Sequence, residues 1–171
     1  MLGFETTLGT CGITWSHTGV TGVLLPGTRG LGRRPERGVD PEAVPGFVRD
    51  AIAAIAALLD GERTDLSWVL LDESGIDPFR RSVYAATREI PPGATASYGD
   101  IARAIAKPDA PRAVGHALGE NPFPIVVPCH RVLSSSGALH GFSAPGGIVT
   151  KRRMLEIERA PGFTQLPLLQ C

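Results

Sequence analysis

Long apolar runs, a secretory leader and a surplus of basic residues are all missing from this sequence. No apolar run approaches the roughly 18 residues that a membrane-spanning helix needs. The opening Met1-Leu-Gly-Phe-Glu has neither the basic nor the apolar part of a signal peptide. Lysine plus arginine and aspartate plus glutamate both number 17, which excludes a polybasic binder of nucleic acid or membranes. We expect a cytoplasmic protein with no membrane partner.

Cysteine is also scarce. The three cysteines, Cys11, Cys129 and Cys171, show no CxxC spacing. This excludes a disulfide framework and a cysteine-based zinc site. The four histidines complete no metal-ligand set with a pair of cysteines. We therefore expect no metal and no cofactor.

The first half of the chain predicts a small sheet with a helix. Apolar residues make up 43% of the 171 residues, which is enough for a packed core. The spacing of apolar residues over 45–59 predicts a helix with one apolar face, and 66–71 has the pattern of a further strand. Three short β-prone runs predict an antiparallel meander: residues 3–7, 11–16 and 19–25.

Residues 26–41 are too rich in glycine, arginine and proline for a regular element. Three arginines in this loop could contact a polyanion, and a solvated loop is the simpler interpretation: Arg33, Arg34 and Arg37. Changes in composition then predict three parts in an α+β chain. These are an N-terminal α/β domain at 1–72, a C-terminal domain at 73–160 and a tail at 161–171.

The second half is richer in helices and in positive charge. Residues 86–171 carry nine basic and six acidic residues, so a site for anions is expected there. Helices are predicted at 79–90, at 98–106 with Ser97 as the N-cap, and at 111–119 with Asp109 as the N-cap. The short connection between the last two is typical of a helix-turn-helix unit.

The helix at 111–119 begins with Arg112 and carries small residues at Ala113, Gly115 and Ala117. Small side chains allow another backbone to approach closely. The pattern alone does not distinguish tight packing on a neighbouring helix from contact with a ligand.

Cys129 is the strongest candidate for chemistry. Prolines bracket the β-branched run 125–127, which predicts a buried extended segment that turns sharply before Cys129. A lone cysteine is often a small buried apolar residue. Here His130 and Arg131 follow directly, and such neighbours favour the reactive thiolate.

A last helix is predicted at 148–159. It carries a basic cluster at residues 151–153 and Glu158 near its end. Glu158 fits either an exposed surface carboxylate or the group that orients the histidine of a Cys-His pair.

Several of these segments together resemble a known family. Pro128-Cys-His-Arg-Val132 follows Asn121-Pro and Arg112-Ala-Val-Gly. Ile90-Pro-Pro-Gly and Ser97-Tyr98-Gly-Asp-Ile-Ala precede them at the family's spacing. In this order, these segments are similar to the signature of the O6-alkylguanine-DNA alkyltransferases, also called methylated-DNA–protein-cysteine methyltransferases. The resemblance is strong over about residues 77–160 and loose before them.

The resemblance implies a fold and an activity. The family pairs an RNase H-like first domain with a winged-helix-like second domain that contains a helix-turn-helix. Its members transfer an alkyl group from O6 of guanine irreversibly to their own cysteine, after the nucleotide is rotated out of the duplex. Double-stranded DNA that carries O6-alkylguanine would be the partner, bound through the minor groove, and O4-alkylthymine a further substrate. No obligate protein partner or cofactor is implied, and we expect a monomer.

The resemblance also implies roles for individual residues. Cys129 would accept the alkyl group, His130 would be the base through a water, and Glu158 would orient His130. Tyr98 would donate a proton towards N3 of guanine, and Asn121 would hold the turn before the active-site segment. Arg112 would fill the space left by the flipped base. The remaining expected contacts are to DNA, from Ser97, Tyr98, Ala113 and Gly115, and to the substrate in the pocket, from Phe142, Ser143 and the backbones of Val127 and Cys129.

Two alternatives and one departure from the family remain. A non-catalytic binder of alkylated DNA would share the architecture but would not need Cys129. A thiol hydrolase would use the Cys129–His130 pair in repeated turnover, although adjacent residues of an extended strand point apart. Ala144-Pro145 separates Ser143 from the glycines that usually follow it closely, which predicts a longer and stiffer loop beside the pocket.

Overall fold

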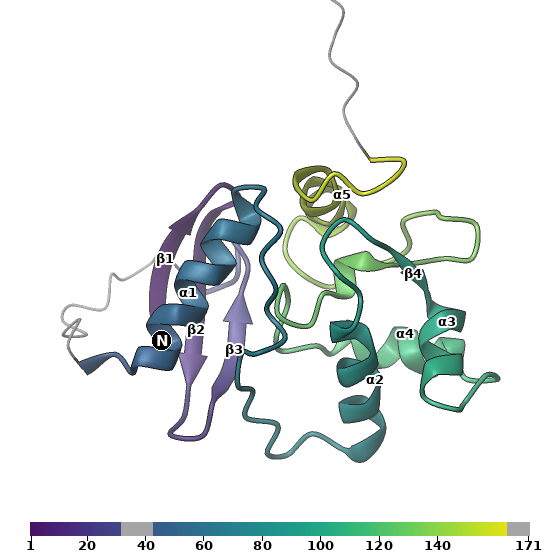
Figure 1. Cartoon of the computed structure of the whole chain (residues 1–171), viewed down its shortest axis with the longest axis horizontal. Helices are drawn as coiled ribbons and strands as arrows, with labels where there is room; N and C mark the ends of the chain where they lie inside the picture. The colour runs from purple at the N-terminus through teal and green to yellow at the C-terminus, as the bar shows by residue number, and fades with distance from the viewer. Residues whose placement is uncertain (32–42, 164–171) are drawn as a thin grey trace, which may run out of the picture.

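The computed structural model describes residues 1–31 and 43–163, and it begins with a three-stranded antiparallel sheet (Figure 1). Strands β1 (Leu2–Thr6), β2 (Gly9–Trp15) and β3 (Val20–Leu24) lie in the order β1-β2-β3. The predicted meander is therefore confirmed. Arg33, Arg34 and Arg37, which the sequence places in a solvated loop or in contact with a polyanion, lie outside the described residues. The chain beyond residue 163 lies outside them as well.

Helix α1 (Gly46–Leu59) packs across this sheet (Figure 1). Its buried residues recur at the three- and four-residue spacing of one helix face: Val48, Ala51, Ile55, Leu58 and Leu59. The helix ends at Asp60, and Gly61 follows with φ of +94°, a conformation that glycine adopts without strain. The sequence prediction of this helix is confirmed to within one residue.

The strand expected at 66–71 does not form. Only Leu71 makes a bridge, a parallel one to Val20. The cause lies in Arg88, whose guanidinium binds the carbonyl oxygens of Leu66, Ser67 and Val69 at 3.1, 2.6 and 2.8 Å. These three carbonyl groups converge on one nitrogen, and Val69 N donates to Leu66 O at 3.1 Å, so the segment turns around Arg88 instead of extending as a strand.

Three helices follow in the second half. Helix α2 (Pro78–Arg88) is capped by Asp77, and α3 (Tyr98–Ala104) begins at the capping box that Ser97 forms with Asp100. Helix α4 (Pro111–Gly119) starts at its proline as predicted. The predicted Asp109 cap is wrong, because Ala110 holds the N-cap position and no side chain bonds there.

The remaining elements are a small parallel sheet and a C-terminal helix. A two-stranded parallel sheet joins β4 (Ala96–Ser97) to β5 (Val132–Leu133), and α5 spans Gly147–Ile157. Buried residues form a continuous core from β2 and α1 to α4 and α5, so the two halves share one apolar interior. Within 1–31 and 43–163, no helix is long and apolar enough to cross a membrane.

Candidate active site

The segment before Cys129 is a compact turn. Val127 N donates to Phe123 O at 2.8 Å, and Ile125 lies in the left-handed region with φ of +77°. The predicted extended strand at 125–127 is therefore wrong, although its three residues are buried as expected. Prolines at 122, 124 and 128 remove backbone donors, which leaves the segment unable to join a ladder.

Asn121 closes this turn from the side. Its Nδ2 donates to Val127 O at 2.9 Å, and its Oδ1 accepts from Phe123 N at 2.9 Å. One side chain thus fixes both ends of the segment that leads to Cys129. Val127 O also accepts from Cys129 N at 2.8 Å, so both of its lone pairs are engaged within the protein. The Val127 side chain is fully buried in the core.

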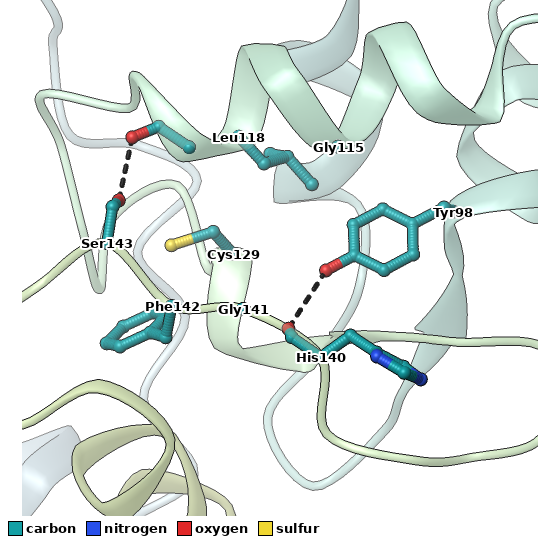
Figure 2. A pocket seen from close by; sticks show the side chains of 9 residues that line it. Tyr98, Gly115, Leu118, Cys129, His140, Gly141, Phe142 and Ser143 are labelled. Atoms are coloured by element: carbon teal, nitrogen blue, oxygen red, sulfur yellow. Dashed lines mark hydrogen bonds between the residues drawn. The ribbon is translucent and has the colours of Figure 1, made fainter.

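Cys129 opens a short 3₁₀ helix, Cys129–Arg131, and its thiol lies at the wall of a pocket of about 420 Å³ (Figure 2). In Figure 2, Tyr98 stands across the pocket, and its hydroxyl donates to the carbonyl of His140 at 3.4 Å. Ser143 Oγ donates to Gly119 O at 2.7 Å at the other end. The lining otherwise comes from α4 and the 140–143 loop: Gly115, Leu118, Gly119, Gly141 and Phe142.

Behind the thiol lies a buried cluster of charged groups. Glu158 Oε1 is 2.8 Å from His130 Nε2. Arg131 donates to both carboxylate oxygens of Glu158, from Nε at 2.9 Å and from Nη2 at 2.8 Å. His130 Nδ1 is buried with no hydrogen-bond partner among the described residues. A buried nitrogen of this kind can accept a proton from a nearby donor or from a bound water.

The Ile90-Pro-Pro-Gly motif holds the same cluster in place. Ile90 O accepts from Arg131 Nη1 at 2.6 Å, and Gly93 N donates to Glu158 Oε2 at 3.1 Å. Gly93 has φ of +79°, and a Cβ there would lie 2.9 Å from Glu158 O. Glycine is therefore required both by conformation and by space.

The electrostatics favour neutral Cys129 and His130 beside an ionised Glu158. Burial raises the pKa of the Cys129 thiol and lowers that of the His130 imidazole. Burial alone would raise the pKa of Glu158, but hydrogen bonds and charges from His130 and Arg131 outweigh it and bring that pKa to about 2. The resting cluster can thus take up a proton at His130, where Glu158 stabilises the resulting imidazolium.

Helix α4 presents two different faces. Val114, Ala117 and Leu118 are buried, whereas Arg112 and Ala113 are exposed. Gly115 faces the Tyr98 ring, where a Cβ would lie 3.7 Å from the nearest ring carbons. Ala117 therefore packs inside the protein, whereas Ala113 lies at the surface. Ser97 is at the start of α3, where its side chain caps the helix.

Comparison with known proteins identifies the family. The family model for the DNA-binding domain of 6-O-methylguanine DNA methyltransferase matches residues 78–160. A methylated-DNA–protein-cysteine methyltransferase of Mycobacterium tuberculosis is 45% identical over 72% of this chain and 73% of its own length. One from Methanothermobacter thermautotrophicus is 33% identical over 86% of this chain and 78% of its own length. This chain belongs to the methylated-DNA–protein-cysteine methyltransferase family.

Solved structures of family members agree with this fold. The Mycobacterium tuberculosis OGT in complex with DNA aligns with a TM-score of 0.70 and 33% identity, covering 94% of each chain. The O6-methylguanine-DNA methyltransferase of Pyrococcus kodakaraensis aligns with a TM-score of 0.66 and 28% identity, covering 91% of this chain and 97% of its own. The mixed α/β arrangement of a small antiparallel sheet and helices is thus a family property.

Ala144 and Pro145, which the sequence predicts to lengthen the loop beside the pocket, lie close to the first half of the chain. A Cβ at Gly27 would lie 3.2 Å from the Pro145 ring, so the loop rests against the turn after β3. Both residues border a second cavity of about 310 Å³, which extends from Cys129 to β3. Ala144 and Pro145 therefore form part of the wall of a cavity that Cys129 also lines.

Sequence reasoning missed two features of the site. Lys151 was expected in a basic surface cluster with Arg152 and Arg153, but it is 1% exposed while the other two lie at the surface. The available signal was its spacing, because Lys151 precedes the apolar Met154 and Leu155 by three and four residues and shares their face. The second feature is His140, which lies in the loop that lines the pocket.

Proposed function

We propose that this chain repairs alkylated DNA by direct reversal, transferring the alkyl group from O6 of guanine in duplex DNA to Cys129. Each molecule reacts once in this proposal, because the thioether formed at Cys129 is stable to hydrolysis and the thiol is not regenerated. The observation that carries the proposal is a cysteine at the wall of a pocket of about 420 Å³, followed directly in the chain by a buried histidine that is 2.8 Å from the Glu158 carboxylate. O4-alkylthymine presents a similar alkylated oxygen and is the second proposed substrate.

The DNA would be engaged through α3 and α4. We assign α4 to the minor groove, where Ala113 permits close approach and Arg112 occupies the space of the rotated nucleotide. Rotation unstacks the base at a cost of a few kcal/mol, which an inserted side chain and phosphate contacts offset. The exposure of Arg112 and the position of Gly115 at the pocket wall support this assignment.

The proposed chemistry uses the proton path behind the thiol. His130 Nδ1 takes the Cys129 proton through a water, and Glu158 holds the imidazolium. The thiolate attacks the alkyl carbon, the S–C bond forms, and the C–O bond breaks with its electron pair left on the purine. Tyr98 then donates a proton to N3 of the leaving guanine. Asn121 keeps the turn in place so that the thiol faces the pocket.

The base itself would be held by Ser143, by the ring of Phe142 and by the Cys129 backbone. The Val127 backbone was expected to join them, but its carbonyl accepts from Asn121 and from Cys129 N, and its N–H donates to Phe123 O. We therefore assign Val127 to the support of the turn. We propose that the protein acts in the cytoplasm as a monomer and without a cofactor. In this proposal its first half is RNase H-like, its second half is winged-helix-like, and the two divide near residue 72.

Intact-protein mass spectrometry tests the proposal. The chain is incubated with a duplex that carries one O6-methylguanine, and the Cys129→Ala variant is treated in parallel. A gain of one methyl group that stops at one equivalent and is absent from the variant is the expected result. Tight binding to the duplex without a mass gain would identify a recognition protein, and the His130–Glu158 scheme would be abandoned.

A further inference from the structure

Lys151 is a buried cation with an unusual set of contacts. Its side chain is 1% exposed, and Nζ donates to Val132 O at 2.7 Å. The ammonium also lies 5.9 Å from the centre of the Tyr98 ring. Within residues 1–31 and 43–163, no carboxylate lies within ion-pair distance of it. Buried charges are normally paired, because an unpaired one costs several kcal/mol of desolvation.

The groups around Lys151 become negative only during a reaction. Helix α5 packs on the 3₁₀ helix that carries Cys129 and His130, and Tyr98 approaches from α3. Burial lowers the pKa of Lys151 and raises the pKa of the Cys129 thiol, and the charges of the two groups offset part of both shifts. His130, the third titratable neighbour, carries no negative charge in either of its forms. The resting site therefore holds a cation whose possible partners are a thiolate and a phenolate.

We propose that Lys151 is the fixed counter-ion of the transfer reaction, stabilising the Cys129 thiolate before attack and the Tyr98 phenolate after proton donation. This inference rests on the proposed function of the site. The thiol proton leaves to His130, so the sulfur carries the electron pair that forms the S–C bond. The electron pair of the broken C–O bond stays on the purine, which takes the Tyr98 proton. Negative charge thus passes from Cys129 to Tyr98, and the Lys151 ammonium, 5.9 Å from the centre of the Tyr98 ring, acts electrostatically on both.

The first test titrates the thiol without DNA. Lys151→Met keeps the length of the side chain and removes its charge. We expect the midpoint of the pH dependence of Cys129 alkylation by iodoacetamide, followed by peptide mass spectrometry, to rise by about one pH unit. This corresponds to a roughly tenfold lower rate near pH 7. The matched control is Arg153→Met, which removes the same charge from an exposed position on α5 and leaves the midpoint in place.

The thermal stability of Lys151→Met distinguishes an electrostatic role of Lys151 from a purely structural one. Lys151→Met relieves the cost of an unpaired buried ammonium and loses the hydrogen bond to Val132 O, so the two effects offset and the variant should melt close to the parent. A lower melting temperature with an unchanged thiol titration would overturn the proposal and leave Lys151 as a hydrogen-bond donor to Val132.

The second test addresses Tyr98. Methyl transfer from O6-methylguanine in duplex DNA is measured for Lys151→Met, Tyr98→Phe and the double variant. We expect the lysine substitution to cost several-fold less in the Tyr98→Phe background, since no phenolate forms there. Fully multiplicative effects would refute the phenolate part. If the parent protein transfers no methyl group, the proposed function fails, whereas the iodoacetamide titration still decides the effect of Lys151 on the thiol.

Discussion

Replacing Glu158 with glutamine removes the negative charge at the centre of the buried cluster and keeps its shape. The carboxylate accepts from Arg131 at 2.8 and 2.9 Å, lies 2.8 Å from His130, and its side chain is 3% exposed. Glutamine cannot neutralise the guanidinium of Arg131, and it presents only one acceptor oxygen. The variant therefore leaves a buried positive charge without its partner.

The pKa of Glu158 sets the size of the effect. It falls from 4.5 to about 2, a difference equivalent to roughly 3 kcal/mol. This agrees with the range of about 3–5 kcal/mol for removing one partner of a buried ion pair. A carboxyl whose pKa is depressed in the folded state stabilises the protein above its unfolded pKa. The contribution is thus complete above about pH 4.5 and is lost as the pH falls towards 2.

Urea unfolding at a series of pH values measures this contribution. Glu158→Gln should lower the unfolding free energy by roughly 3 kcal/mol at pH 7. The gap between variant and parent should narrow steadily below pH 4.5, where the carboxyl of the unfolded parent takes up a proton while the folded protein keeps its charge down to about pH 2. Glu156→Gln, two residues earlier on α5 and partly exposed, is the matched control and should stay within about 0.5 kcal/mol.

Two results would refute this reasoning. Equal stability of Glu158→Gln and the parent at pH 7 would mean that the cluster contributes no net charge stabilisation. A deficit that persists unchanged to pH 3 would mean that packing rather than charge is responsible.

Three further substitutions probe the DNA contact, the turn and the support of α4. Arg112→Ala should slow methyl transfer from duplex DNA far more than transfer from free O6-methylguanine, and equal losses in the two assays would remove Arg112 from the nucleotide-rotating role. Asn121→Ala removes the acceptor of Phe123 N and one of the two donors to Val127 O, and it should cost about 1–3 kcal/mol in urea unfolding because a buried backbone donor loses its partner. It should also slow Cys129 alkylation, and an unchanged alkylation rate would show that the turn keeps its shape without Asn121. Tyr84→Phe removes the buried hydrogen bond to Ala117 O and should cost about 1–2 kcal/mol, while a stability equal to the parent's would mean that water replaces the hydroxyl.

Local patterns were sufficient to predict most elements. The helix at 46–59 follows from its apolar spacing, and the start of α3 follows from Ser97 and Asp100 three residues apart. These features depend on neighbours along the chain. The strand expected at 66–71 failed because Arg88, about 20 residues later, takes its carbonyl groups. Propensity cannot reveal a partner so distant in sequence.

The site could be predicted only where its residues are neighbours in the sequence or belong to the motifs of the family. Cys129 and His130 stand together in the sequence, so their chemistry was visible, and the resemblance singled out Glu158. The placement of Arg131 between Ile90 and Glu158 depends on three segments that meet only in the fold. Burial of Lys151 against Tyr98 likewise needs α5 to pack on the segment that carries Cys129. Such contacts require the tertiary structure.

The most direct test of direct reversal counts both products of one reaction. A duplex with a single O6-methylguanine is mixed with excess protein, the DNA is digested to nucleosides, and the protein is digested to peptides. We predict one restored guanine and one S-methylated Cys129 for every lesion lost, with no abasic site and no free methanol. Lesion loss without methylated Cys129, or methylated Cys129 without restored guanine, would contradict the account.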